Sequence, residues 1–66
     1  MNEFGNRLSD LLVSSDTTQR ELARQIGVSN ATISRIISGD GNAMLKTVIA
    51  IADHFSVDLD WLVGRE

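Results

Sequence analysis

The chain has 66 residues, a formal net charge of −3, no cysteine and no proline. That length provides one domain with a small core, and the lack of cysteine excludes disulfide bonds and zinc sites built from thiolates. No apolar run approaches the roughly 18 residues of a membrane span, and the N-terminus has no signal-peptide pattern. We therefore expect a soluble cytoplasmic protein with no membrane partner. The acidic balance argues against binding of nucleic acid by bulk charge alone.

Good helix formers throughout the chain predict an all-α domain, with a first helix over residues 2–13. Asn2 can cap the start of this helix, and a polar connector follows it at residues 14–17. The inner side of the helix has the apolar spacing that burial requires and consists of Phe4, Leu8, Leu11 and Leu12.

The 22 residues from Thr18 to Gly39 predict two short helices, over 19–26 and 30–37, joined by a tight corner. Thr18 followed three residues later by Glu21 forms a capping box, in which each residue bonds the backbone amide of the other. Since Gly39 can end the second helix, both boundaries of the segment carry a recognisable signal.

A small residue and a glycine shape the corner between these two helices. Ala23 lets the two backbones approach, and Gly27 can take the left-handed conformation in which the first of them ends. Ser29 is a good N-cap for the second. Its buried side consists of the apolar residues Ile33, Ile36 and Ile37. Together these features predict a helix-turn-helix, a unit that commonly places its second helix in the major groove of DNA.

Two further helices are expected after the turn residues 40–42, the first over 44–54. Asp58 can cap the second, over 59–63, and Gly64 closes it. The apolar residues that we expect the longer helix to bury are Leu45, Val48, Ile49, Ala52 and Phe55.

Positive charge is concentrated in the middle of the chain. Residues 19–46 carry a net charge of +2, whereas residues 1–18 carry −2 and residues 47–66 carry −3. The helix-turn-helix segment is therefore also the part best suited to a polyanion, although so few basic groups predict weak non-specific affinity.

Four motifs can be read along the chain: T-Q-x-E-L-A from Thr18, I-G-V-S from Ile26, I-S-x-I-x-S-G from Ile33 and V-D-L-D-W-L-V-G from Val57. Together they resemble the phage repressor and Cro type of helix-turn-helix domain, the xenobiotic-response-element family, and the resemblance covers nearly the whole chain. It implies a compact five-helix bundle of the lambda-repressor-like type. It also implies a bacterial or phage transcriptional repressor that binds a palindromic or pseudo-palindromic double-stranded DNA operator as a homodimer.

The family positions that contact bases match the outward side of the predicted helix 30–37. Asn30 could pair with adenine, Arg35 could pair with guanine, and Ala31 could sense a thymine methyl group. Ser29 and Ser34 lie nearby. The alternative for Arg35 is an ordinary solvated helix face, but this side lacks the Glu–Lys pairs that are usual on such faces.

The resemblance also implies contacts to the DNA backbone. Gln19 matches the family's phosphate-bracing glutamine, although a solvated first-turn residue is the alternative. Gly41, Asn42 and Lys46 match the loop and fourth helix that meet the backbone. The predicted backbone set is completed by Thr18, Arg20 and Ser38. Arg20 could equally form a surface ion pair of little energetic value.

Departures from the family pattern predict local differences. Leu12 and Ile37 stand where many members have a paired arginine and glutamate, so we expect an apolar contact in place of a salt bridge. Asp16 replaces a usual glycine and is tolerable at positive φ, and Ala43 replaces a usual proline.

The last predicted helix carries more apolar surface than one small core can hide. The residues assigned to a two-fold dimer interface are Leu59, Trp61, Leu62 and Val63, of which Trp61 and Leu62 could instead pack in the core.

Other functional classes receive less support. There is no cysteine, one histidine (His54) and no glycine-rich phosphate loop, so we expect no enzyme activity, cofactor, metal or small-molecule ligand. A second hypothesis is a protein-binding module such as an antitoxin or adaptor, which fits the acidic balance. A third is that the chain is the N-terminal domain of a longer repressor whose C-terminal part dimerises.

Overall fold

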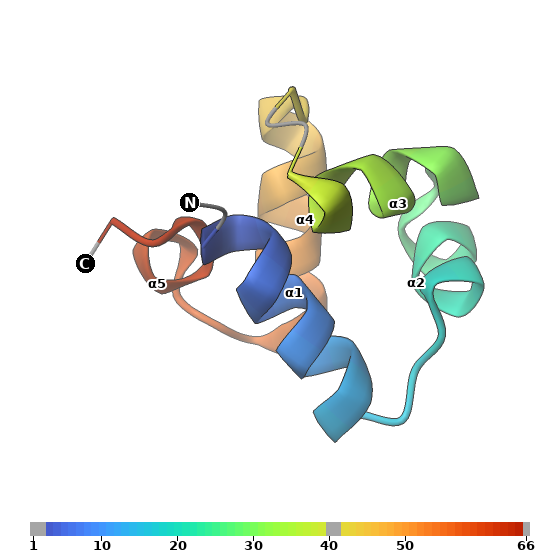
Figure 1. The fold of residues 1–66 in the computed structure, drawn as a ribbon, viewed down its shortest axis with the longest axis horizontal. Helices are drawn as coiled ribbons and strands as arrows, with labels where there is room; N and C mark the ends of the chain where they lie inside the picture. The colour runs from blue at the N-terminus through green and yellow to red at the C-terminus, as the bar shows by residue number, and fades with distance from the viewer. Residues whose placement is uncertain (1–2, 40–41, 66) are drawn as a thin grey trace.

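A computed structural model describes residues 3–39 and 42–65 of the chain, and these residues form five helices without a strand (Figure 1). The helices are α1 (Glu3–Ser14), α2 (Gln19–Ile26), α3 (Asn30–Ser38), α4 (Leu45–Phe55) and α5 (Leu59–Val63). The predicted all-α, five-helix architecture is confirmed, with boundaries that differ by a residue at several ends. The predicted cap at Asn2 lies outside the described residues. No helix in the described ranges has both the length and the apolarity to cross a membrane.

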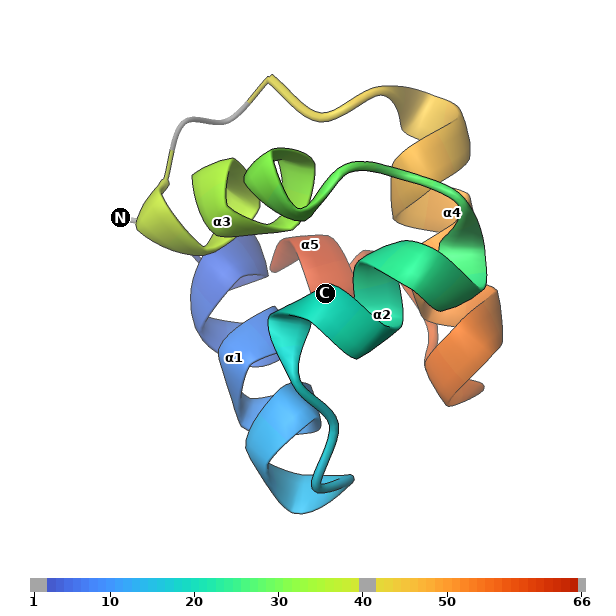
Figure 2. The ribbon, with the colours of Figure 1, turned by 90° about the vertical axis from the view of Figure 1, so that its right-hand side faces the viewer.

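Each helix contributes one fully buried side chain to a single apolar cluster. These side chains are Leu8 from α1, Leu22 from α2, Ile33 from α3, Ile51 from α4 and Leu62 from α5. Full burial of a side chain of this size contributes about 1.5–3 kcal/mol. Because all five helices share this cluster, α3 is packed on its inner side, where α1 lies beneath it (Figure 2). The residues on its opposite side are exposed.

The corner between α2 and α3 has the predicted local structure. The Thr18 amide donates to Glu21 Oε1 at 2.9 Å and the Glu21 amide donates to Thr18 Oγ1 at 3.0 Å, so the capping box is complete. Gly27 adopts φ +78°, and the Val28 amide donates to the carbonyl of the buried Ala23 at 2.9 Å. The chain thus turns directly from α2 into α3 beside a small side chain.

The buried stripe of α4 differs from the predicted one. Leu45 is 68% exposed and Ile49 is 41% exposed, so these two predictions of burial are wrong. Val48 and Ala52 are buried as predicted, and Thr47 and Ile51 complete the buried side of α4. The apolar spacing of this segment supports two overlapping stripes, and packing against α2 and α5 selects the one that buries a threonine.

The first and last helices, α1 and α5, are joined by contacts that the sequence pattern did not predict. The Arg7 guanidinium on α1 donates to the Trp61 carbonyl on α5, lies 5.0 Å from the centre of the Trp61 ring, and pairs with Glu3 at 3.3 Å. At the end of α5, a Cβ atom on Gly64 would collide with Glu3 Cβ, so only glycine fits there without a shift. These contacts fasten α5 to α1 on the side of the bundle away from α2 (Figure 1).

Candidate nucleic-acid interface

The outward side of α3 is uncovered along its whole length. Ile33 and Ile36 are buried beneath the helix, and Ile37 is half-buried against the core. The residues on the opposite side are all exposed: Ser29, Asn30, Ala31, Ser34, Arg35 and Ser38. The bundle therefore presents a continuous surface of small and polar side chains on a helix that is fixed from below. The assignment of these residues to bases or backbone stays a prediction.

Ser29 fixes the start of this surface as the N-cap of α3. Its hydroxyl accepts from the Thr32 amide at 3.1 Å and lies 2.9 Å from Thr32 Oγ1. Gly39, at φ +95°, ends the helix as predicted. Because Ser29 and Gly39 define the two ends of α3, these two residues also determine how long the exposed surface is.

A hydrogen bond links the exposed side of α3 to the start of α2. Ser34 Oγ donates to Gln19 Oε1 at 2.8 Å, and Gln19 is half-buried as the first residue of α2. The structure therefore brings together a predicted base contact and a predicted phosphate contact. Because the two residues are 15 positions apart, no local sequence pattern could have revealed the bond.

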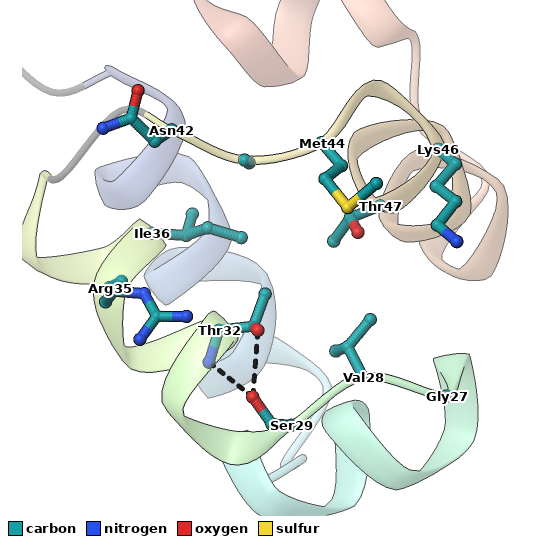
Figure 3. A pocket seen from close by; sticks show the side chains of 11 residues that line it. Gly27, Val28, Ser29, Thr32, Arg35, Ile36, Asn42, Met44, Lys46 and Thr47 are labelled. Atoms are coloured by element: carbon teal, nitrogen blue, oxygen red, sulfur yellow. Dashed lines mark hydrogen bonds between the residues drawn. The ribbon is translucent and has the colours of Figure 1, made fainter.

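A groove with a volume of about 360 Å³ runs beside the exposed side of α3 (Figure 3). Arg35 on α3 and Lys46 on α4 lie on opposite walls, and the exposed Met44 lies between them. Asn42 lies on the wall formed by the loop that leads to α4, and the buried Thr47 completes the α4 side. Two cationic side chains from different helices thus flank one opening. Gly41, the third residue predicted for this region, lies outside the described residues.

The remaining predicted backbone contacts lie around the start of α2. Thr18 and Arg20 are exposed, and the hydroxyl of Thr18 already accepts the Glu21 amide. Hydrogen bonds from the Thr18 backbone and side chain, with a smaller contribution from the charge of Arg24, lower the pKa of Glu21 below its usual value of 4.5. Glu21 is therefore ionised at neutral pH and offsets part of the positive charge on this helix.

On α5, the four predicted interface residues divide into two groups. Leu59 and Val63 are 36% and 37% exposed and could meet a second molecule. Leu62 is fully buried in the core, so its assignment to the surface of an interface does not agree with its position. Trp61 is half-buried beneath Arg7. The crowding of apolar residues on this short helix is thus largely explained by the core.

Within the described ranges, no three His, Cys, Asp or Glu side chains come together in a way that could hold a metal ion. The exposed side of α3 and the groove offer hydroxyl, amide and cationic groups instead. Such groups are those that proteins use to contact base edges and phosphate oxygens.

A family model for the helix-turn-helix matches residues 8–62, which include all of α2 through α4 and most of α1 and α5. The chain belongs to the Cro/repressor-type helix-turn-helix family. Members of this family are DNA-binding transcriptional regulators rather than enzymes. The four motifs quoted above lie within or at the edge of the matched region, so the resemblance seen in the sequence is confirmed.

Several curated relatives carry regulatory names. The chain is 36% identical to the "HTH-type transcriptional activator BcrR" of Enterococcus faecalis over 97% of its own length and 31% of the relative. It is 37% identical to the "HTH-type transcriptional regulator for conjugative element SXT" of Vibrio cholerae over 94% of its length and 28% of the relative. It is 30% identical to the "Cryptic phage CTXphi transcriptional repressor RstR" of Vibrio cholerae serotype O1 over 89% of its length and 53% of the relative.

The chain spans about a third of the length of the first of these relatives. No solved structure matches the chain significantly.

Proposed function

We propose that this chain is the DNA-binding domain of a bacterial or phage transcriptional repressor. In this proposal α3 enters the major groove of an operator, and a two-fold dimer contacts a palindromic or pseudo-palindromic site. The observation that carries the proposal is the exposed side of α3, where small and polar residues lie opposite the buried Ile33 and Ile36. This arrangement fits a helix that is held by its own bundle for contact with another molecule.

The proposed roles follow from the chemistry of each side chain. Arg35 would form a bidentate pair with guanine O6 and N7, and Asn30 would form one with adenine. Ala31 would contact a thymine methyl group. Each good bidentate pair contributes about 1–3 kcal/mol of discrimination against the wrong base pair.

Phosphate contacts would position the domain on both sides of α3. Gln19 and Arg20 at the start of α2 would meet one stretch of backbone, and Lys46 across the groove from Arg35 would meet another. Lys46 in the first turn of α4 is unfavourable for the helix dipole by a few tenths of a kcal/mol, and a phosphate beside it would reverse that cost.

The proposed dimer is formed through α5. Leu59 and Val63 remain accessible and lie four residues apart, on one side of a short helix. Two copies of α3 would then contact half-sites about 34 Å apart. In this proposal Val63→Glu weakens dimer formation and, with it, operator binding, while the domain still folds. Sedimentation at increasing protein concentration measures the loss of dimer formation directly.

Selection of bound sequences from a random pool of duplex DNA tests the proposed function. The wild-type chain is expected to enrich a two-fold symmetric site, with an affinity that falls steeply as salt is raised. Arg35→Ala is expected to lower the affinity about tenfold or more and to relax the preference at one base pair per half-site. Arg65→Ala, which removes the same charge from an exposed position beyond α5, is the matched control and is expected to leave the preference unchanged.

A pool that shows no enrichment at any salt concentration would contradict the proposal and favour the protein-binding alternative.

A further inference from the structure

The hydrogen bond between Ser34 and Gln19 determines what each side chain can still do. A serine hydroxyl carries a single proton, and in this bond the Ser34 proton is donated to Gln19 Oε1 at 2.8 Å. Ser34 can therefore donate to a base edge only by giving up this bond. Its remaining capacity is as an acceptor.

The same bond restrains the direction of the Gln19 side-chain oxygen. With Oε1 held by α3, the two N–H groups of Nε2 lie on the other side of the amide and can only donate. Gln19 is the first residue of α2, next to the N-cap Thr18, where the positive end of the helix dipole favours an anion. A half-buried Gln19 side chain also has less rotational freedom to lose on binding than an exposed one.

We propose that Ser34 is a positioning residue for DNA binding rather than a base contact: it holds the Gln19 amide so that its N–H groups face a backbone phosphate at the start of α2. The inference rests on the proposed function, because it requires that α3 lies against DNA. It replaces the assignment of Ser34 to bases and makes the contribution of Ser34 to affinity dependent on Gln19.

The experiment is a double-mutant cycle on the operator that the wild-type chain selects from random DNA. Affinities of the wild type, Ser34→Ala, Gln19→Ala and the double variant are measured on that operator and on every single-base-pair change of it. Ser34→Ala is expected to weaken binding about threefold to tenfold, the effect of losing one well-placed hydrogen bond. The loss is expected to be the same on every operator variant.

The double variant is expected to bind within about twofold of Gln19→Ala, because the loss of Gln19 removes the group that Ser34 positions. Ser14→Ala is the matched control. Ser14 is an exposed serine at the end of α1 whose hydroxyl donates to the Leu11 carbonyl at 3.2 Å, and its replacement is expected to leave affinity unchanged. Thermal melting of each variant separates weaker binding from loss of fold.

Three results would overturn the inference. Ser34→Ala could change the preference at one base pair, which would make Ser34 a base contact. The losses of the two single variants could multiply in the double variant, or Ser34→Ala could bind as well as the wild type. A wild-type chain that enriches no sequence would instead defeat the proposed function itself, and this outcome is seen before any variant is made.

Discussion

The corner between α2 and α3 is held by contacts between residues that are close in the sequence. The contact between α1 and α5, made by Arg7 and Trp61 and called the seam below, joins residues that are far apart in the sequence. At the corner, Thr18 and Glu21 bond each other across three positions, and Gly27 allows the chain to turn. At the seam, Arg7 reaches the Trp61 carbonyl 54 residues further along the chain. Local sequence therefore shapes the unit that would contact DNA, whereas tertiary packing places the helix that would form the dimer.

This difference means that the two regions should respond separately to substitution. A change at the seam should move or loosen α5 and leave the shape of the α2–α3 corner intact. A change at the corner should weaken α2 and leave the attachment of α5 to α1 in place. The prediction with the largest expected effect tests the core that both regions share, and the three that follow it test this separation.

Leu12→Arg should destabilise the fold most, by about 3 kcal/mol, because it places a charge at a position that is buried in the apolar core. Leu12 and the half-buried Ile37 line one groove between the end of α1 and the end of α3, at the two positions where the resemblance implies a paired arginine and glutamate in many members of the family. Urea unfolding followed by circular dichroism measures the change. Ile37→Glu in the same chain should restore part of the stability, and an unchanged midpoint for Leu12→Arg alone would contradict the packing described here.

Arg7→Met should cost about 2 kcal/mol, because a charge-assisted hydrogen bond and a cation–π contact are both lost while the side-chain stem remains. Hydrogen exchange is expected to accelerate at the amides of Leu62 and Arg65 more than at those of α2 and α3. Arg7→Lys keeps the charge without the planar guanidinium and should be intermediate. Equal acceleration in all five helices would show that the seam and the corner are not separable.

Thr18→Ala should cost about 1 kcal/mol through the loss of an N-cap. The effect is expected to appear as faster exchange at the first amides of α2, including that of Glu21, with no change at α5. Thr17→Ala, one residue earlier and outside the capping box, is a matched control with a smaller expected effect. Stability equal to that of the wild type would mean that the capping box contributes nothing to the corner.

Glu21→Gln should have the smallest effect, which is visible mainly in acid. The pKa of Glu21 is lowered in the folded chain by its bonds to Thr18, so its stabilising contribution is complete above the ordinary value of 4.5 and is lost as the pH falls through the lowered pKa. The variant is therefore expected to lose less stability than the wild type between about pH 5 and pH 3. Asp10→Asn, which removes a carboxylate from an exposed position on α1, provides the control.

The comparison of the two regions also explains how far the sequence could predict this structure. The caps at Thr18, Ser29 and Asp58 and the left-handed glycines at the ends of α2, α3 and α5 were predictable, because each depends on residues within one turn of helix. Asp16, predicted to tolerate positive φ, adopts φ +55°. These local signals were sufficient to define the helix-turn-helix.

What could not be predicted depends on packing between distant segments. The sequence predicts that Leu45 lies on the buried side of α4, but in the structure Leu45 is exposed and Thr47 is buried. The neighbouring helices decide which of the two overlapping apolar faces of α4 packs against the core. The bond between Ser34 and Gln19 and the contacts of Arg7 join residues with no periodic relation in the sequence. Family resemblance supplied candidate DNA contacts but not the side-chain bonds within this chain.

The central claim is that the outward side of α3 lies against base edges, and a nuclear magnetic resonance titration with the selected operator tests it most directly. The amide signals of Asn30, Ala31 and Arg35 are expected to shift most, together with the side-chain amide of Gln19, while those of Val13 and the control residue Arg65 stay nearly unchanged. The largest shifts falling on α1 and α5, with α3 unaffected, would contradict the account.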